Sequence, residues 1–239
     1  LTNDGSIIND GGQIVNNGTL NIEGGEFGEN TIENNGKVNV NGGDVEDAIV
    51  NGDDAIVGSF IYSAEELQAA VDAAVAGTAN EFTLAADIEG DVVVVIQKPD
   101  VKITIDGADH KFNGYFRVHS NSNHYADAAL TIKNVNFETS TASVNFIDAL
   151  EKGAERYSTN ITIEGCTFTA TGDAVNTAVG AHVKSTRNFV MNGCEGKNLH
   201  SLLQANSCDV GCPLEIKNCQ TIDCKGGISF TQILSSVVE

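Results

Sequence analysis

A short repeat near the N-terminus is the feature that most restricts how this chain can fold. The segment 14–27 (IVNNGTLNIEGGEF) returns 18 residues later as 32–45, with seven of 14 positions identical. Leu20 and Ile22 alternate with polar residues, so they share one face of a short strand. One copy cannot bury that face, whereas stacked copies can. The repeat therefore predicts a small β-solenoid over residues 1–57, with Asn-Gly and Gly-Gly pairs at its corners. The alternative is a loose Gly/Asn-rich linker, which would not need the spaced aliphatic residues.

A longer and less regular repeat runs through the rest of the chain. Five segments share the order apolar, polar, apolar, polar, Gly or Asn, small apolar, and they begin at Ile103, Leu130, Ile161, Phe189 and Leu214. The Gly or Asn indicates a bend in the left-handed region, at Gly107, Asn134, Gly165, Gly193 and Asn218. A second apolar stretch follows each bend. Each repeat is therefore typical of one turn of a parallel β-helix, stacked about 4.8 Å from the next.

One amphipathic helix is predicted between the two repeats, over residues 64–76. Ser63 and Glu66 have the spacing of a capping box, and Gly77 suits the end of the helix. An apolar stripe has helical spacing and consists of Leu67, Ala70, Val71, Ala74 and Val75. We expect this helix to cover the open end of the β-structure that occupies residues 60–239, where core and strand edges would otherwise be exposed.

The order of these elements resembles a known superfamily. The capped helix, the strand EFTL (81–84) and the segments VKITIDG (101–107) and LTIKN (130–134) are similar to pectate-lyase-like right-handed parallel β-helices, most of all those of bacterial surface or secreted proteins. The resemblance covers about residues 60–239. With the repeats it predicts an all-β chain: a right-handed parallel β-helix (β-solenoid) with one short capping α-helix and an N-terminal Gly/Asn-rich repeat region. It also implies an extracellular or cell-surface location.

The charge of the chain excludes several partners. Thirteen Lys and Arg against 33 Asp and Glu give a formal charge of −20. No basic surface is expected that could neutralise nucleic-acid phosphates or anionic lipid. No stretch approaches the roughly 18 apolar residues of a membrane span. Nucleic acid and a membrane crossing are therefore not predicted.

Three of the six cysteines occupy one position of the longer repeat. Cys166, Cys194 and Cys219 stand where the earlier repeats have Val135 and Ala108. We therefore predict an interior column of small hydrophobic side chains.

The spacing of the later cysteines alone would also fit zinc, but the repeat argues against a metal site. Cys208 and Cys212 fall in a loop, where a disulfide is possible in an oxidising compartment. Cys224 is assigned to neither group.

No catalytic set is predicted. Asp106, Asp109 and His110 are close in sequence, but carboxylates are common at bends of β-helices, and glycosidases need two across one bond. No catalytic motif of the superfamily matches residue by residue. No cofactor is predicted; the alternative is calcium at the acidic corners formed by Asp44, Glu46, Asp47, Asp53 and Asp54.

The candidate binding site follows from strand alternation. If Phe116, Val118, Val144 and Phe146 point inward, polar neighbours point outward and stack into a stripe: Tyr115, Arg117, His119, Asn145 and His182. The loops after these strands add His124, Tyr125, Arg156 and Tyr157. These residue types suit contact with a sugar or peptide. The alternative is a solvated face with ordinary loops.

Two classes of function are compatible with these features. The first is a non-catalytic extracellular module, adhesin-like or a stalk, with a glycan or another host or cell-surface ligand. The second is a polysaccharide-acting enzyme (lyase or hydrolase) or a tailspike-like protein, which would need convergent carboxylates. The segment 228–239 resembles an unfinished repeat, so the chain is also compatible with a fragment of a larger protein.

Overall fold

The computed structural model describes residues 2–3, 13–29, 31–45, 48–53, 55–89, 93–96, 101–118, 129–149, 158–184, 186–206, 213–231 and 236–238. These residues are mostly β, with one α-helix and one short 3-10 helix, η1 (Gly172–Ala174). The strands form four sheets, and neighbouring strands within each sheet are parallel. The predicted all-β class with parallel sheets is confirmed.

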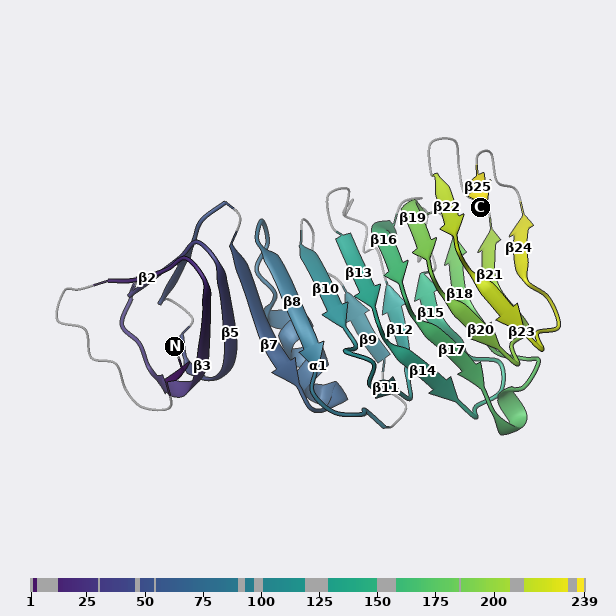
Figure 1. The fold of residues 1–239 in the computed structure, drawn as a ribbon, viewed down its shortest axis with the longest axis horizontal. Helices are drawn as coiled ribbons and strands as arrows, with labels where there is room; N and C mark the ends of the chain where they lie inside the picture. The colour runs from purple at the N-terminus through teal and green to yellow at the C-terminus, as the bar shows by residue number, and fades with distance from the viewer. Residues whose placement is uncertain are drawn as a thin grey trace.

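The largest sheet runs along the whole molecule (Figure 1). Its eleven strands, in spatial order, are β1 (Thr2–Asn3), β3 (Thr19–Glu26), β5 (Lys37–Asp44), β7 (Ile56–Ile61), β8 (Ala79–Leu84), β10 (Lys102–Asp106), β13 (Ala129–Lys133), β16 (Ser158–Glu164), β19 (Thr186–Asn192), β22 (Leu214–Lys217) and β25 (Ser236–Val238). The sheet continues from the 18-residue repeats into the longer repeat through the pairing of β7 with β8. The division into two domains stays a prediction.

Two further sheets accompany the longer repeat. One has the order β11 (Lys111–Phe112), β14 (Asn136–Thr139), β17 (Thr167–Ala170), β20 (Glu195–Lys197) and β23 (Gln220–Ile222). The other contains β9 (Val93–Ile96), β12 (Tyr115–Val118), β15 (Asn145–Ala149), β18 (Val179–Lys184), β21 (Ser201–Asn206) and β24 (Ile228–Thr231). From β10 onward the chain visits the 11-, 5- and 6-stranded sheets in turn. We call each set of three successive strands, such as β10–β12, a rung.

The N-terminal repeats form paired strands and not a loose linker. β2 (Ile14–Asn16), β4 (Ile32–Asn34) and β6 (Ile49–Asn51) make a three-stranded sheet, and β3 pairs with β5 at an offset of 18 residues. Leu20 and Ile22 are buried, as predicted, in a small core of their own. The buried Asn34 side chain accepts from Asn16 Nδ2 and donates to Asn51 Oδ1, each at 2.9 Å, so a ladder of amides joins successive repeats.

The prediction of corners at the Gly-Gly pairs is wrong. Gly24 and Gly25 lie inside β3, where the pairing with β5 shifts register and Gly25 has φ +102°. A glycine adopts this φ without a clash, so the pair gives the strand an irregularity and not a turn.

The helix α1 (Ala64–Ala73) starts where predicted and ends three residues early. Ser63 Oγ accepts from the Glu66 amide at 3.2 Å, and Glu66 Oε2 accepts from the Tyr62 amide at 2.7 Å. The amide side chain of the buried Asn80 bonds both the N–H and the C=O of Val75, at 3.0 and 2.9 Å, so these groups are not used by the helix. Val75 is correspondingly 47% exposed, against the prediction.

The buried face of α1 belongs to the larger of the two cores. Ala64, Leu67, Val71 and Ala74 pack in one cluster with the interior side chains of the rungs. The helix is thus part of the N-terminal end of this core, next to the separate core of the 18-residue repeats.

The left-handed bends are confirmed at four of five positions. Asn134, Gly165, Gly193 and Asn218 have φ between +52° and +63°. The first rung differs because Asp106 pairs with Lys133 and Lys111 with Asn136, which leaves two extra residues before β11. Ala108 and Asp109 carry the positive φ there instead of Gly107.

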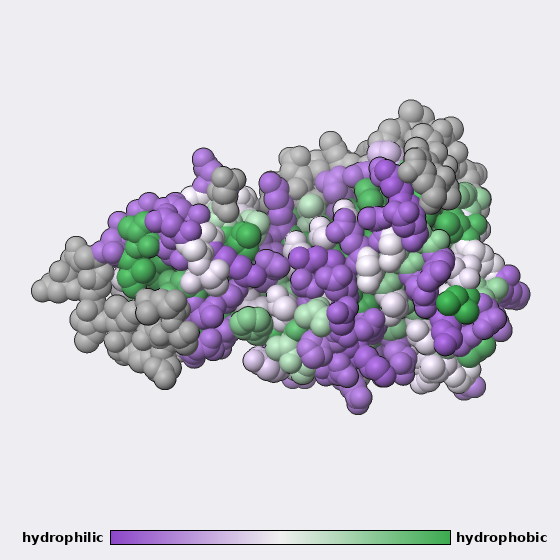
Figure 2. All heavy atoms as spheres, in the orientation of Figure 1, coloured by the Kyte–Doolittle hydropathy of each residue, from purple (hydrophilic) through white to green (hydrophobic). Residues whose placement is uncertain are grey.

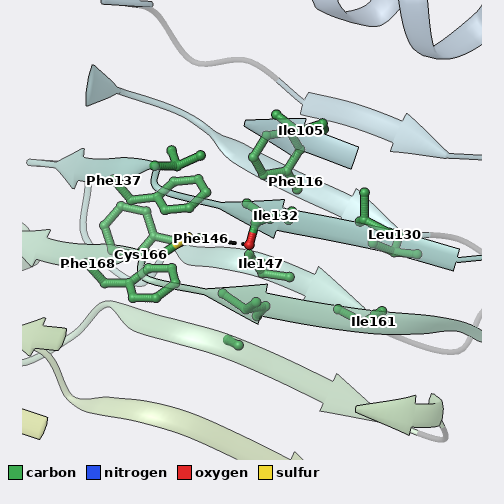
Figure 3. Packing of buried hydrophobic residues seen from close by; sticks show 14 of the residues in the cluster. Ile105, Phe116, Leu130, Ile132, Phe137, Phe146, Ile147, Ile161, Cys166 and Phe168 are labelled. Atoms are coloured by element: carbon green, nitrogen blue, oxygen red, sulfur yellow. Dashed lines mark hydrogen bonds between the residues drawn. The ribbon is translucent and has the colours of Figure 1, made fainter. Parts of the chain in front are cut away.

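The cysteine column is confirmed for the three predicted thiols. Cys166 and Cys194 are fully buried and Cys219 is partly buried, and each donates to a main-chain carbonyl of the preceding rung. Figure 3 shows the contact of Cys166 with the Ile132 carbonyl. Val135 is buried, as predicted, but Ala108 is exposed, because the two extra residues of the first rung place it in the wider bend.

A cluster of aromatic rings fills the core beside the column. Phe137 stacks on Phe168 with ring centroids 5.0 Å apart, and Phe112 stacks on Phe116 at 4.9 Å. Phe146 contacts both Phe137 and Phe168 at 5.7 Å (Figure 3). These rings come from the 5- and 6-stranded sheets, so their packing fixes the sheet that carries the candidate site against its neighbour.

Candidate functional site

The candidate site includes the outward face of β12. Phe116 and Val118 are fully buried, so alternation turns Tyr115 and Arg117 outward, as predicted. The Arg117 side chain is 41% exposed, and its guanidinium carbon lies 5.7 Å from the centre of the Tyr115 ring. This cation–π contact holds the planar guanidinium beside the aromatic ring.

The next strand departs from the predicted alternation. Phe146 and Ile147 are consecutive and both are buried in the core, and Ile147 pairs with Phe116. The residue beside Arg117 is therefore Asp148 and not the predicted Asn145. The prediction that Val144 points inward is also wrong, because Val144 is only partly buried and faces a surface cleft.

The same interruption recurs in the strands stacked beyond β15. Gly180 and Ala181 in β18 are both buried, as are Leu202 and Leu203 in β21. Each strand therefore buries successive residues at this level before alternation resumes. The resulting stripe on the 6-stranded sheet consists of Arg117, Asp148, His182, Gln204 and Ser229.

Asp148 is the central residue of this stripe. One of its oxygens lies 4.0 Å from Arg117 Nε and the other 3.9 Å from His182 Nδ1. Asn145 Nδ2 donates to Asp148 Oδ1 at 3.4 Å and lies 3.3 Å from His182 Nδ1. The Asp148 side chain is only 14% exposed. Asn145 and His182 are thus brought together as site residues, but through a carboxylate that strand alternation did not predict.

A cleft of about 280 Å³ opens beside Arg117, Asn145 and Asp148. Its walls combine one aromatic ring, one cation, one carboxylate and several neutral polar groups, and the lining residues are Tyr115, Arg117, Thr141, Ser143, Val144, Asn145 and Asp148. We call it the polar cleft. Ser143 has φ +61°, and its amide donates to Thr177 Oγ1 at 3.2 Å, which fixes the bend before β15. The remaining predicted site residues, His119, His124, Tyr125, Arg156 and Tyr157, lie outside the described residues.

The two carboxylates considered for catalysis differ in their surroundings. Asp106 accepts from the Ala108 amide at 3.0 Å and pairs with Lys133 Nζ at 3.1 Å. Burial by itself would raise the pKa of Asp106, but these bonds and that from Asn134 outweigh it and lower the pKa. Asp109 is exposed on the bend.

His110 has a different partner from Asp106. Its Nδ1 lies 3.1 Å from Asp87 Oδ1, which also accepts from the Lys111 amide at 2.9 Å. The Lys111 amide and the His110 ring together lower the pKa of Asp87. Asp106 and His110 therefore belong to two separate polar contacts.

Lys133 also joins a charged network on the 11-stranded sheet. Its Nζ lies 3.5 Å from Glu81, and the other Glu81 oxygen accepts from Lys37 Nζ at 2.9 Å. Burial opposes the charge of Lys133, but Asp106 and Glu81 outweigh it and raise its pKa. The face seen in Figure 2 is largely hydrophilic, with small separated apolar patches. We interpret the network as a stabilising link between strands, since all its charges are paired within the protein.

A second cavity has a different character. It measures about 320 Å³ and lies between α1, β7 and β8, with a mostly apolar lining that includes Val57, Ala70 and Phe82. The amide of Asn80, a polar group in its wall, is already bonded to three main-chain carbonyls. Ser59 is the other polar side chain in the described lining, so this cavity offers a sugar or peptide fewer polar groups than the polar cleft does.

Within the described part of the chain, no three His, Cys, Asp or Glu residues are grouped as metal ligands would be. Asp53 is exposed, the side chain of Asp44 is not described, and the other acidic residues of the calcium prediction lie outside the described residues, as do Cys208 and Cys212. Cys224 accepts from the Leu199 amide at 3.4 Å. None of the helices described here has the length and apolar character that a membrane crossing requires.

Comparison of the chain with protein-family models, with curated proteins and with solved structures gives no match.

Proposed function

We propose that this chain is a right-handed parallel β-helix of the pectate-lyase-like kind, secreted or displayed on a cell surface, that acts as a non-catalytic glycan-binding module. The cyclic order of the strands through three parallel sheets supports the β-helix. The handedness follows the general rule for crossovers between parallel strands. The acidic composition, with a formal charge of −20, favours an extracellular adhesin or stalk over a partner of nucleic acid or lipid.

The composition of the polar cleft is the observation that carries the binding proposal. Sugar recognition uses planar polar side chains for hydroxyl groups and an aromatic ring for the apolar face of the pyranose. The cleft supplies Arg117, Asn145 and Asp148 for the first purpose and Tyr115 for the second. They project from two adjacent strands, β12 and β15, and are held by buried neighbours on both.

The same cleft favours binding over hydrolysis. Glycoside hydrolysis needs two carboxyl groups on opposite sides of one glycosidic bond. Of the described residues that line the cleft, Asp148 is the one carboxylate. A polyuronate lyase of this superfamily would need a cationic groove, whereas Arg117 is the one cation among the same residues.

A glycan array with the intact chain, followed by titration of each hit, tests the proposal. We expect binding of at least one oligosaccharide, with no release of reducing ends and no unsaturated uronate on long incubation. Turnover that is lost in Asp148→Asn would instead establish the polysaccharide-acting enzyme. The absence of binding to every glycan of the array would overturn the binding proposal.

A further inference from the structure

The hydrogen bonding of Asp148 leaves an unused acceptor in the polar cleft. An ionised carboxylate has about four lone-pair positions for hydrogen bonds. Within the described structure, Asp148 has one hydrogen bond, from Asn145 at 3.4 Å, and its contacts with Arg117 at 4.0 Å and His182 at 3.9 Å are longer than hydrogen bonds. A carboxylate this buried normally has its oxygens satisfied. Because Asp148 lies in the wall of the cleft, a hydrogen-bond donor on a bound ligand could reach its unused oxygen positions.

The cation beside Asp148 determines which donor fits. Arg117 and Asp148 are close enough for their charges to offset each other, so the cleft as a whole offers a donor fork and an acceptor at little net charge. A sugar hydroxyl can donate and accept at the same time. Two neighbouring hydroxyls can therefore donate to Asp148 while their oxygens accept from Arg117 or Asn145.

An acidic sugar fits this arrangement poorly. Its carboxylate or sulfate would approach Arg117 at the cost of repulsion from Asp148, a few ångströms away. The formal charge of −20 also lowers the local concentration of polyanions around the molecule. Neither penalty applies to an uncharged glycan.

We infer that the polar cleft binds a neutral glycan and that Asp148 accepts hydrogen bonds from a pair of its adjacent hydroxyl groups. This inference rests on the proposed glycan-binding function and specifies its ligand class. Tyr115, whose ring lies against the Arg117 guanidinium, also lines the cleft and would contact the apolar face of the sugar ring.

The test titrates the intact chain with matched neutral and anionic probes. Maltohexaose, cellohexaose, mannohexaose and a galactan hexamer represent neutral glycans, and hexagalacturonate and a heparin hexasaccharide represent acidic ones. Binding of a neutral probe should change by less than about twofold between 0.1 M and 1 M salt, over which the Debye length falls from about 10 to 3 Å. Binding of an anionic probe through charge would change far more.

Two variants with the same charge change locate the effect. Asp148→Asn keeps the shape but replaces a charged acceptor, and we expect the affinity for the neutral probe to fall by about tenfold or more. Asp72→Asn, on the exposed face of α1, should leave the affinity unchanged. Thermal unfolding checks that both variants fold. If Asp148→Asn does not fold, Tyr115→Ala replaces it, with an expected loss of about fivefold or more.

The outcomes separate the two proposals. Binding of acidic probes alone, or full affinity of Asp148→Asn for a neutral probe, would overturn the neutral-glycan inference and leave glycan binding in place. Failure of both probe classes to bind would overturn the function on which it rests. The comparison of probes uses the unaltered chain and does not depend on the folding of any variant.

Discussion

Replacing Phe137 by alanine should be among the most damaging single changes to this protein. The ring is 1% exposed and lies at the centre of the aromatic cluster. It stacks on Phe168 at 5.0 Å and meets Phe112 and Phe116 edge-on at 5.8 and 5.6 Å. Phe146 is its fourth ring neighbour, at 5.7 Å. The substitution thus removes contacts between three successive rungs at once.

The expected cost follows from the size of the cavity and the number of rings around it. Burial of a phenylalanine side chain is worth about 1.5–3 kcal/mol in transfer free energy. The cavity left by a Phe→Ala change brings typical losses to about 3–5 kcal/mol. Four aromatic neighbours, each worth about 0.5–1.5 kcal/mol in pair geometry, place Phe137 in the upper half of that range. A loss of about 4–5 kcal/mol is comparable with half the stability of many domains.

Urea unfolding monitored by far-ultraviolet circular dichroism measures this loss, as the shift of the midpoint multiplied by the slope. Phe60→Ala is the matched control, because Phe60 is 38% exposed in β7 and should cost less than about 1 kcal/mol. A loss below about 2 kcal/mol for Phe137→Ala, or one equal to that of the control, would refute the packing of rings described above.

Three further substitutions test other parts of the structure. Gly107→Ala should cost about 3 kcal/mol or more, because the added methyl group would overlap the Asn134 carbonyl oxygen. The control Gly227→Ala has open space around it and should be near neutral. Equal urea midpoints for the two variants would contradict the close approach of the first two rungs. Asn34→Ala should cost about 2–3 kcal/mol, because it breaks the buried amide ladder. Hydrogen exchange in β4 should accelerate more in this variant than in the control Asn35→Ala, because the Asn35 side chain is exposed. The neighbouring Cys166 thiol, together with burial, raises the pKa of Cys194 to about 12. Stability should therefore be full below about pH 8.5 and fall by up to about 1.4 kcal/mol per pH unit between there and pH 12, and Cys194→Ala should reduce this fall. A pH profile that is the same in both proteins would argue against the buried thiol.

Much of the fold was predictable because stacked rungs repeat the same local requirement. The bend in each rung needs a positive φ, and Gly or Asn meets that need at Asn134, Gly165, Gly193 and Asn218. The column of thiols followed from the same register. The prediction failed in the first rung because its bend contains two added residues. A repeat template does not reveal such an insertion when the next strand returns to the same alignment, as Lys111 does with Asn136.

The site was only partly predictable, for a reason that lies in the core. Strand alternation correctly turned Tyr115 and Arg117 outward, since β12 alternates without interruption. It failed in β15, where Phe146 fills the aromatic cluster and Ile147 stacks beside Phe116, so that two neighbours face inward. Beyond this point, a strict period of two assigns each residue of the strand to the wrong face, so it places Asp148 in the core and not in the cleft. Two consecutive large apolar residues followed by Asp were the available signal.

The continuous 11-stranded sheet has a consequence for how such a molecule can change in size. Its neighbouring strands are spaced by about 4.8 Å, and equivalent residues in successive rungs pair directly. Duplication of one segment between equivalent asparagines, such as Asn134 and Asn218, would therefore lengthen the rod in fixed increments while leaving its cross-section and the existing ring contacts intact. Under the proposed function, length could therefore evolve independently of recognition: the number of copies of the segment would set the length, and a few side chains on two rungs would set the specificity.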